Sequence, residues 1–179
     1  MDAARLLGVL RPLLEATNAR WAIAGGFAVI AWGSTRTTFD LDLVVDETAR
    51  PELLSRLTSA GFHVLGDPPG FTNLIHPDPD LGRLDLIWLQ GTTCERIFAA
   101  AVSKPAADGR IAFVPAPEHL VTMKVKAIKS RPTRVFRDGE DLRVLLSLPE
   151  IDQNEAREIF ETNGLTELYD RIRKAAGQA

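Results

Sequence analysis

The stretch from Trp21 to Asp46, WAIAGGFAVIAWGSTRTTFDLDLVVD, constrains the fold of this chain more than any other segment. Its pattern predicts an apolar strand, a Gly-Gly turn, a short helix, a polar loop and a second apolar strand that carries Asp40 and Asp42. Residues two apart on a strand share a face, so the two carboxylates lie side by side. Like charges repel and Asp is depleted in strands, so a cation between them accounts for the pair. Mg²⁺ is the natural occupant, because it takes oxygen ligands and shares them with substrate phosphates.

The glycine pair upstream of these carboxylates predicts a phosphate-binding turn. Gly25 and Gly26 precede a short helix, where exposed backbone N–H groups and the positive helix end attract phosphate and no Cβ is in the way. Arg36 follows in the loop between the glycines and the carboxylates. A contact with phosphate and an ordinary surface position both fit this arginine.

A third carboxylate, Asp85, lies in a strongly apolar segment, RLDLIWL. An Asp in a central strand is costly unless it is paired or binds a metal. One interpretation is a salt bridge to Arg83, which shares its face two residues earlier. We favour the other interpretation, in which Asp85 is a third metal-binding carboxylate beside Asp40 and Asp42.

Composition places the chain among ordinary globular proteins. Its 179 residues are 45% hydrophobic and 25% charged, which suits one domain with a substantial core. We find no apolar run of about 20 residues and no signal-peptide pattern, so we expect no membrane association. The single cysteine, Cys94, excludes an internal disulfide and favours a cytoplasmic protein. The net charge of −3 argues against nucleic-acid binding by the whole surface, although a local basic patch is compatible with it.

The order of the predicted elements indicates an α/β (α+β) fold. Residues 1–115 form an α/β core, and residues 116–179 form a helical part that packs on it. Three predicted strands follow one another without an intervening helix, so the sheet is mixed and not doubly wound. The predicted strands are 21–24, 39–45, 62–65, 71–75, 83–89 and 111–114, and the predicted helices are 3–16, 26–32, 51–60, 94–102, 117–130, 136–148 and 154–174, the last in one or two pieces.

The helical part contains a lysine in an apolar position. Lys124 falls in the middle of the apolar stripe of its helix, whereas Lys126 and Lys129 face away. Asp138 holds a similar place on the next helix, so we expect the two to pair, either for structure alone or to hold Lys124 toward a triphosphate. Residues 124–143 also contain seven of the 21 Lys and Arg residues, which is either a solvated helix face or a surface for a polyanion.

Two groups of these motifs resemble known families. Gly25-Gly26, Asp40-Leu41-Asp42 and the distant Asp85 resemble the nucleotidyltransferase superfamily, which has the DNA polymerase beta-like fold. Pro117–Lys124, together with Arg134 and the run from Arg137 to Leu142, resembles the C-terminal signature of AbiEii-type nucleotidyltransferases. These are the toxin-like branch of bacterial toxin–antitoxin and phage-defence systems.

The resemblance implies Mg²⁺-dependent transfer of a nucleoside monophosphate from a nucleoside triphosphate to an acceptor hydroxyl. The acceptor is RNA, a protein side chain or a small molecule, and a cognate antitoxin is an expected partner. The implied roles are metal binding by Asp40 and Asp42, acceptor activation at the metal site by Asp85, and nucleotide binding by Gly25, Gly26, Arg36, Lys124 and Asp138.

One departure from the superfamily pattern leaves alternatives open. Phe27 follows the glycine pair where the superfamily motif has serine, so a hydroxyl contact to phosphate is lost. The first alternative is therefore a catalytically inactive binding or regulatory member of the same fold. The second is a small-molecule nucleotidyltransferase of the antibiotic-modifying type, which needs an acidic pocket for a cationic acceptor.

Overall fold

The computed structural model describes residues 1–176, and its contacts divide the chain into two compact units. The first unit comprises Met1–Ala31 and Arg36–Pro115, and the second comprises Trp32–Thr35 and Ala116–Ala179. The packing of the helical part on the core stays a prediction.

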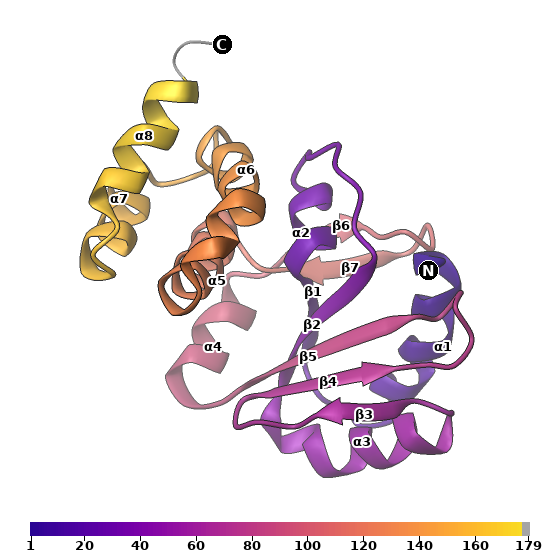
Figure 1. Ribbon diagram of the computed structural model, residues 1–179. Helices are drawn as coiled ribbons and strands as arrows, with labels where there is room; N and C mark the ends of the chain where they lie inside the picture. Colours follow the sequence, from indigo (N-terminus) through magenta and orange to yellow (C-terminus); the bar gives the residue numbers. More distant parts are fainter. Residues whose placement is uncertain (177–179) are drawn as a thin grey trace. The chain divides into compact units, whose positions relative to one another are not determined.

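A five-stranded mixed sheet organises the first unit (Figure 1). Its order is β1-β2-β5-β4-β3, in which β2 and β5 are parallel and all other neighbours are antiparallel. The prediction of a mixed sheet is therefore confirmed. The strands are β1 (Trp21–Ala24), β2 (Asp40–Asp46), β3 (His63–Gly66), β4 (Phe71–Ile75) and β5 (Arg83–Leu89).

One face of this sheet is covered by two helices, α1 (Ala3–Glu15) and α3 (Arg50–Ser59) (Figure 1). The short helix η1 (Glu47–Ala49) leads from β2 into α3. Alternate residues of the central strands, such as Leu41 and Leu84, are fully buried on this side. The opposite face therefore receives the residues between them, which include Asp40, Asp42 and Asp85.

The remaining elements of the first unit are two short helices and a hairpin. Helix α2 (Gly25–Ala31) follows β1 directly, and α4 (Gly91–Ala99) follows β5. Strands β6 (Val102–Pro105) and β7 (Ile111–Val114) pair in an antiparallel hairpin. The predicted helix over 94–102 is therefore wrong at both ends: the helix begins earlier, and Val102 already belongs to a strand.

The remaining helices of the described chain belong to the second unit (Figure 1). They are α5 (Pro117–Ser130), α6 (Val135–Leu146), α7 (Gln153–Thr162) and α8 (Thr166–Ala176), with the short helix η2 (Pro132–Arg134) before α6. Helix α5 packs on α6 and α7, and α8 packs on the same two helices. The predicted helix over 154–174 is two helices, separated at Gly164, which has a φ of +73°. No helix in the described part of the chain is long and apolar enough to span a membrane.

Candidate functional site

The parallel pairing of β2 with β5 brings the three predicted carboxylates to one face of the sheet. Asp42 lies directly opposite Asp85, and Asp40 lies opposite Arg83. Residues opposite each other in a ladder point to the same side, and Asp40 lies two residues from Asp42. The strand register therefore brings the three residues to one face of the sheet, and their joint binding of a metal ion stays a prediction. Two acids directly opposite each other destabilise a sheet unless a cation offsets their repulsion.

Asp40 and Asp85 are held in place by neutral and cationic donors. Thr38 Oγ1 donates to Asp40 Oδ1 over 2.7 Å. Asp85 is only 6% exposed, and its Oδ1 accepts hydrogen bonds from Asn73 Nδ2 at 2.7 Å and Arg83 Nε at 3.1 Å. The salt bridge to Arg83 considered from the sequence is thus present. It compensates the burial of Asp85 and leaves the position of this carboxylate beside Asp42 unchanged.

The carboxylates suit a metal ion that shares its ligands with a substrate. Within residues 1–176 no group of three or more His, Cys, Asp or Glu side chains is arranged so that it could hold a metal ion alone. Mg²⁺ is usually bound by one or two carboxylates together with substrate phosphates. Asp40 and Asp42 supply two such carboxylates on neighbouring positions of one face. These residues therefore fit Mg²⁺ brought in with a nucleotide, and do not form a closed protein cage.

The two glycines allow site side chains to approach the backbone at the start of α2. Gly25 has a φ of +55°, and a Cβ at this position would overlap the Asp42 carboxylate. At Gly26 a Cβ would lie 2.6 Å from Arg36 Nη2 and 2.7 Å from Thr38 Oγ1. The glycines thus bring Asp42 and the Arg36 guanidinium to the first turn of α2, where backbone N–H groups have no partner within the helix. A phosphate-binding role for Gly25, Gly26 and Arg36 stays a prediction.

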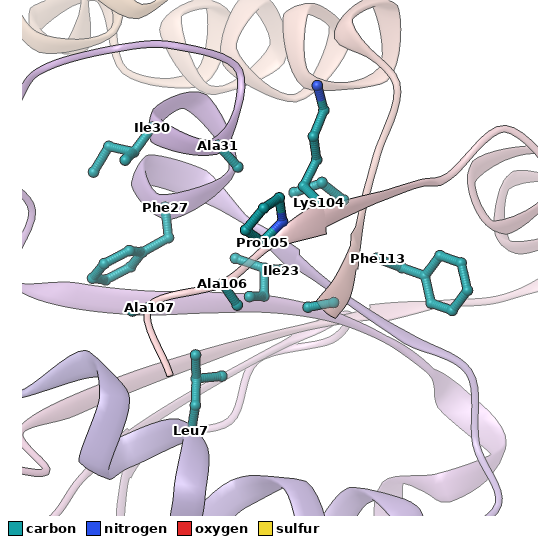
Figure 2. Close-up of a pocket in the computed structure, with 12 residues that line it drawn as sticks. Leu7, Ile23, Phe27, Ile30, Ala31, Lys104, Pro105, Ala106, Ala107 and Phe113 are labelled. Carbon is teal, nitrogen blue, oxygen red and sulfur yellow. The ribbon is translucent and has the colours of Figure 1, made fainter. Parts of the chain in front are cut away.

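Phe27, the residue that departs from the superfamily pattern, lines an apolar cavity (Figure 2). Its neighbours in the cavity wall include Ile23 of β1 and Ile30 of the same helix. The Phe27 ring therefore contributes apolar surface, and no hydroxyl is present at this position to contact phosphate.

In the second unit, Lys124 pairs with Asp138 as the helix periodicity predicted. Lys124 is 7% exposed, and its Nζ lies 3.2 Å from Asp138 Oδ1 and 2.6 Å from Asp141 Oδ2. Arg134 Nε also donates to Asp138 Oδ2 at 2.6 Å. Burial alone would raise the pKa of Asp138, but the charges of Lys124 and Arg134 outweigh it and lower that pKa. This network compensates the burial of two carboxylates in the helical unit.

The basic run around this network is partly paired with its own acids. Arg143 forms a two-point contact with Glu140, and Arg137 lies 3.8 Å from Asp138. Lys126 and Lys129 are exposed on α5, as predicted. The argument from this run for an anionic acceptor is therefore weaker than the sequence indicates.

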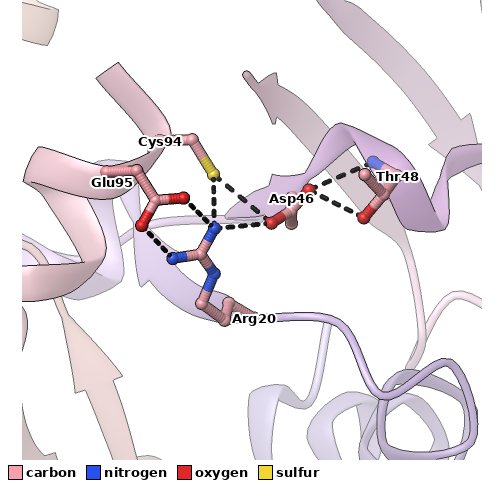
Figure 3. Close-up of polar contacts among 5 residues, drawn as sticks. All are labelled: Arg20, Asp46, Thr48, Cys94 and Glu95. Atoms are coloured by element: carbon pink, nitrogen blue, oxygen red, sulfur yellow. Dashed lines mark hydrogen bonds and ion pairs between the residues drawn. The ribbon is translucent and has the colours of Figure 1, made fainter. Parts of the chain in front are cut away.

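A second polar cluster lies at the far end of β2 from Asp40 (Figure 3). Arg20 Nη2 lies 2.8 Å from Asp46 Oδ2 and 2.7 Å from Glu95 Oε1, so it ties the strand to α4. The hydrogen bond from Arg20 holds the pKa of Asp46 at about 2. Burial, reinforced by the Asp46 charge, raises the pKa of the Cys94 thiol to about 11. The cluster is structural, and Cys94 is unsuited to act as a nucleophile at neutral pH.

Three side chains in these networks were not singled out from the sequence. Thr38 precedes Asp40 by two residues, a spacing that could have indicated its contact. Asp141 follows Asp138 by three residues on a helix, so periodicity places both on one face. Asn73 had no local signal, because it reaches Asp85 only through the register of β4 against β5.

Comparison with known proteins supports the fold. A family model described as aminoglycoside-2''-adenylyltransferase matches residues 6–90, which include the glycine pair and all three carboxylates. A solution structure of the antibiotic-resistance factor ANT(2'')-Ia has a TM-score of 0.68 at 16% identity, covering 98% of this chain and 97% of its own. The chain has a nucleotidyltransferase fold. Among curated proteins, no sequence matches it.

Further solved structures share this fold. The lincosamide antibiotic adenylyltransferase LnuA, bound to lincomycin, has a TM-score of 0.59 at 17% identity, covering 80% of this chain and 96% of its own. An antigenic nucleotidyltransferase-like protein from Paracoccidioides brasiliensis has a TM-score of 0.60 at 18% identity, covering 96% and 92%. The family match and these likenesses support the prediction of a nucleotidyltransferase enzyme.

Proposed function

We propose that the protein transfers a nucleoside monophosphate from a nucleoside triphosphate to a hydroxyl of a small-molecule acceptor, with Mg²⁺ as cofactor. The acceptor oxygen bonds to the α-phosphorus, and the bond between the α- and β-phosphates breaks with release of pyrophosphate. The observation that carries this proposal is the register of β2 and β5, which places Asp40, Asp42 and Asp85 on one face beside the first turn of α2. Nucleotidyl transfer needs carboxylates that hold divalent metal and a base that receives the acceptor proton. The site supplies both from adjacent strands.

In this mechanism each side chain has a separate task. Asp40 and Asp42 would hold the metal, which would stabilise the charge that develops on the α-phosphate. Asp85 receives the proton of the acceptor hydroxyl; Asn73 and Arg83 both contact its Oδ1 and thereby fix the carboxylate. Arg36 lies over the first turn of α2, where its guanidinium can pair with a phosphate oxygen.

The small-molecule acceptor is preferred to RNA for two reasons. The matching family model is named for an aminoglycoside adenylyltransferase, and it spans the segment that holds the proposed catalytic residues. Four of the seven basic residues in the run that favoured RNA form ion pairs with Asp138, Asp141 and Glu140. An AbiEii-type toxin role, an antitoxin partner and a cytoplasmic location stay predictions.

The nature of the small molecule follows in part from the face beside Asp85. On β4 the residues that share this face are Phe71, Asn73 and Ile75, none of which is charged. The acidic pocket that a polycationic aminoglycoside requires is not formed by these residues. Both a polycationic and a less charged antibiotic are therefore needed as test acceptors.

The experiment uses the full chain, Mg²⁺ and each α-³²P-labelled nucleoside triphosphate in turn, with tobramycin, lincomycin or total RNA as acceptor. We expect a labelled small-molecule product that disappears in EDTA and in the Asp42→Asn variant, whose fold is checked by circular dichroism. Asp80→Asn, an exposed acid paired with Arg5, serves as the control and should keep the parent rate. Label on RNA alone would overturn the choice of acceptor. An Asp42→Asn variant as active as the parent would overturn the site.

Lys124 and Asp138 stay predicted nucleotide-binding residues. Lys124→Met distinguishes a structural role of the lysine from a role in binding the triphosphate. If the role is only structural, the variant should be less stable and its KM for the triphosphate should be unchanged. If the lysine also holds the triphosphate, the still folded variant should need more nucleoside triphosphate or react more slowly. Comparing KM for the triphosphate at a temperature where the variant is fully folded distinguishes these outcomes.

A further inference from the structure

The cavity beside Phe27 is a well-formed apolar space within the first unit (Figure 2). Its volume is about 400 Å³. Helix α2 forms one wall through Phe27, Ile30 and Ala31, and the β6–β7 hairpin forms another. Leu7 of α1 and Ile23 of β1 complete it. Helix α1, the consecutive β1 and α2, and the β6–β7 hairpin therefore line a partly open space of the size that small-molecule ligands occupy.

The lining determines which chemistry the cavity can accept. Apart from Lys104, its residues are Ala, Leu, Ile, Val, Phe and Pro. Figure 2 shows the Lys104 side chain extending away from Phe27 and Leu7. A closed apolar cavity of about 150 Å³ binds a benzene-sized molecule, so a space of about 400 Å³ has room for about two aromatic rings. A charged ligand would lose its hydration here without gaining enough polar contacts.

We propose that this cavity binds a compact, uncharged apolar molecule and that its occupation modulates the nucleotide site. The link is α2 itself: Phe27 and Ala31 face the cavity, while Gly25 and Gly26 in the first turn of the same helix adjoin Asp42 and Arg36. A ligand that holds α2 in one position therefore also favours one position of the Asp42 carboxylate and the Arg36 guanidinium, which adjoin its first turn. The modulation rests on the proposed transferase function, whereas the binding itself does not.

Binding is tested on the full chain by fluorescence titration with N-phenyl-1-naphthylamine, a neutral two-ring probe. We expect saturation at one molecule per chain, with a blue-shifted emission. Its anionic counterpart, 8-anilinonaphthalene-1-sulfonate, should bind about tenfold more weakly or worse, because Lys104, the one charged residue of the lining, extends away from Phe27 and Leu7. Tighter binding of the anion would overturn the assignment of an uncharged ligand.

A matched pair of variants locates the probe. Ala31→Leu fills part of the cavity from the last residue of α2, and Ala99→Leu adds the same side chain at the exposed last residue of α4. Ala31→Leu should raise the dissociation constant about tenfold or more, whereas Ala99→Leu should leave it unchanged. Equal titrations of the two variants would overturn the site. If Ala31→Leu does not fold, Ala106→Leu on the hairpin wall makes the same test.

The proposed effect of the ligand on the nucleotide site is tested by a separate measurement. Transferase activity is followed by the release of pyrophosphate. In this assay a saturating concentration of the probe should change KM for the nucleoside triphosphate, and Ala31→Leu should abolish that change. A titration that succeeds with an unchanged KM would overturn the modulation and retain the binding site. If the protein had no transferase activity, the proposed function would be refuted. The titration would still show whether the cavity binds the neutral probe.

Discussion

Replacing Gly25 with alanine should destabilise the protein through two separable effects. The first is backbone strain, since Gly25 has a φ of +55°, where an L-residue costs about 1–2 kcal/mol. The second is a collision, because the new Cβ would overlap the Asp42 carboxylate and lie 2.7 Å from the Asp42 Cβ. Ordinary contact begins at 3.4 Å, so even the Asp42 Cβ would have to recede by about 0.7 Å. Such overpacking costs about 1–3 kcal/mol.

Gly91→Ala is a control that carries the strain without the collision. Gly91 has a φ of +56°, and a Cβ there would have no neighbour within 4 Å. We expect Gly91→Ala to lose about 1–2 kcal/mol of unfolding free energy and Gly25→Ala to lose about 2–5 kcal/mol. Urea denaturation followed by circular dichroism measures both. In the transferase assay the rate of the Gly25→Ala variant should be about 100-fold lower than that of the parent, since the substitution displaces Asp42, a proposed metal ligand, by on the order of 1 Å.

The role of Asp42 in this effect can be isolated by a double-mutant cycle. In a chain that already carries Asp42→Gly, no Asp42 side chain is present to collide with a Cβ at position 25. Gly25→Ala should then lower the free energy of unfolding only as much as Gly91→Ala does. The coupling free energy between the two positions should therefore be about 1–3 kcal/mol. Equal losses for Gly25→Ala and Gly91→Ala in the parent chain, or a coupling near zero, would refute the contact between Gly25 and Asp42.

Three further measurements test the polar networks of the two units. Lys124→Met should cost about 3–5 kcal/mol of unfolding free energy because it removes the buried ion pairs of Lys124 with Asp138 and Asp141. Lys126→Met on the exposed side of the same helix should change this free energy by no more than about 0.5 kcal/mol, and equal losses would contradict the network. Arg20 lowers the pKa of Asp46 from 3.8 to about 2, so this carboxylate stabilises the fold above pH 4 and loses that effect as the pH falls to 2. Urea titrations at pH 6 should therefore show Asp46→Asn about 2 kcal/mol less stable than the parent, and the gap should narrow below pH 4; a gap independent of pH would refute the linkage. Cys94, with its pKa raised to about 11, should react with 5,5'-dithiobis(2-nitrobenzoate) at pH 8 far more slowly in the folded protein than in urea, and equal rates would show an accessible thiolate.

Local periodicity was enough to predict the parts of the site that lie on one element. The period of two along a strand places Asp40 and Asp42 on one face, and the helical period places Lys124 on the apolar side of α5. The same signals predicted the mixed sheet from the order of its strands. They failed at β6, because VSKP has no strong apolar pattern and forms a strand only by pairing with β7.

The tertiary structure alone decided which of these residues meet. Asp42 faces Asp85 because β2 and β5 pair in parallel, and Asn73 reaches Asp85 because β4 pairs with β5 in one register. Gly25 is required by the carboxylate that packs on it, which is a contact across 17 residues of chain. Strand register depends on the packing of whole faces and is not encoded near any one of these residues. The sequence therefore determined the chemical groups and their local faces, and the folded sheet determined their partners.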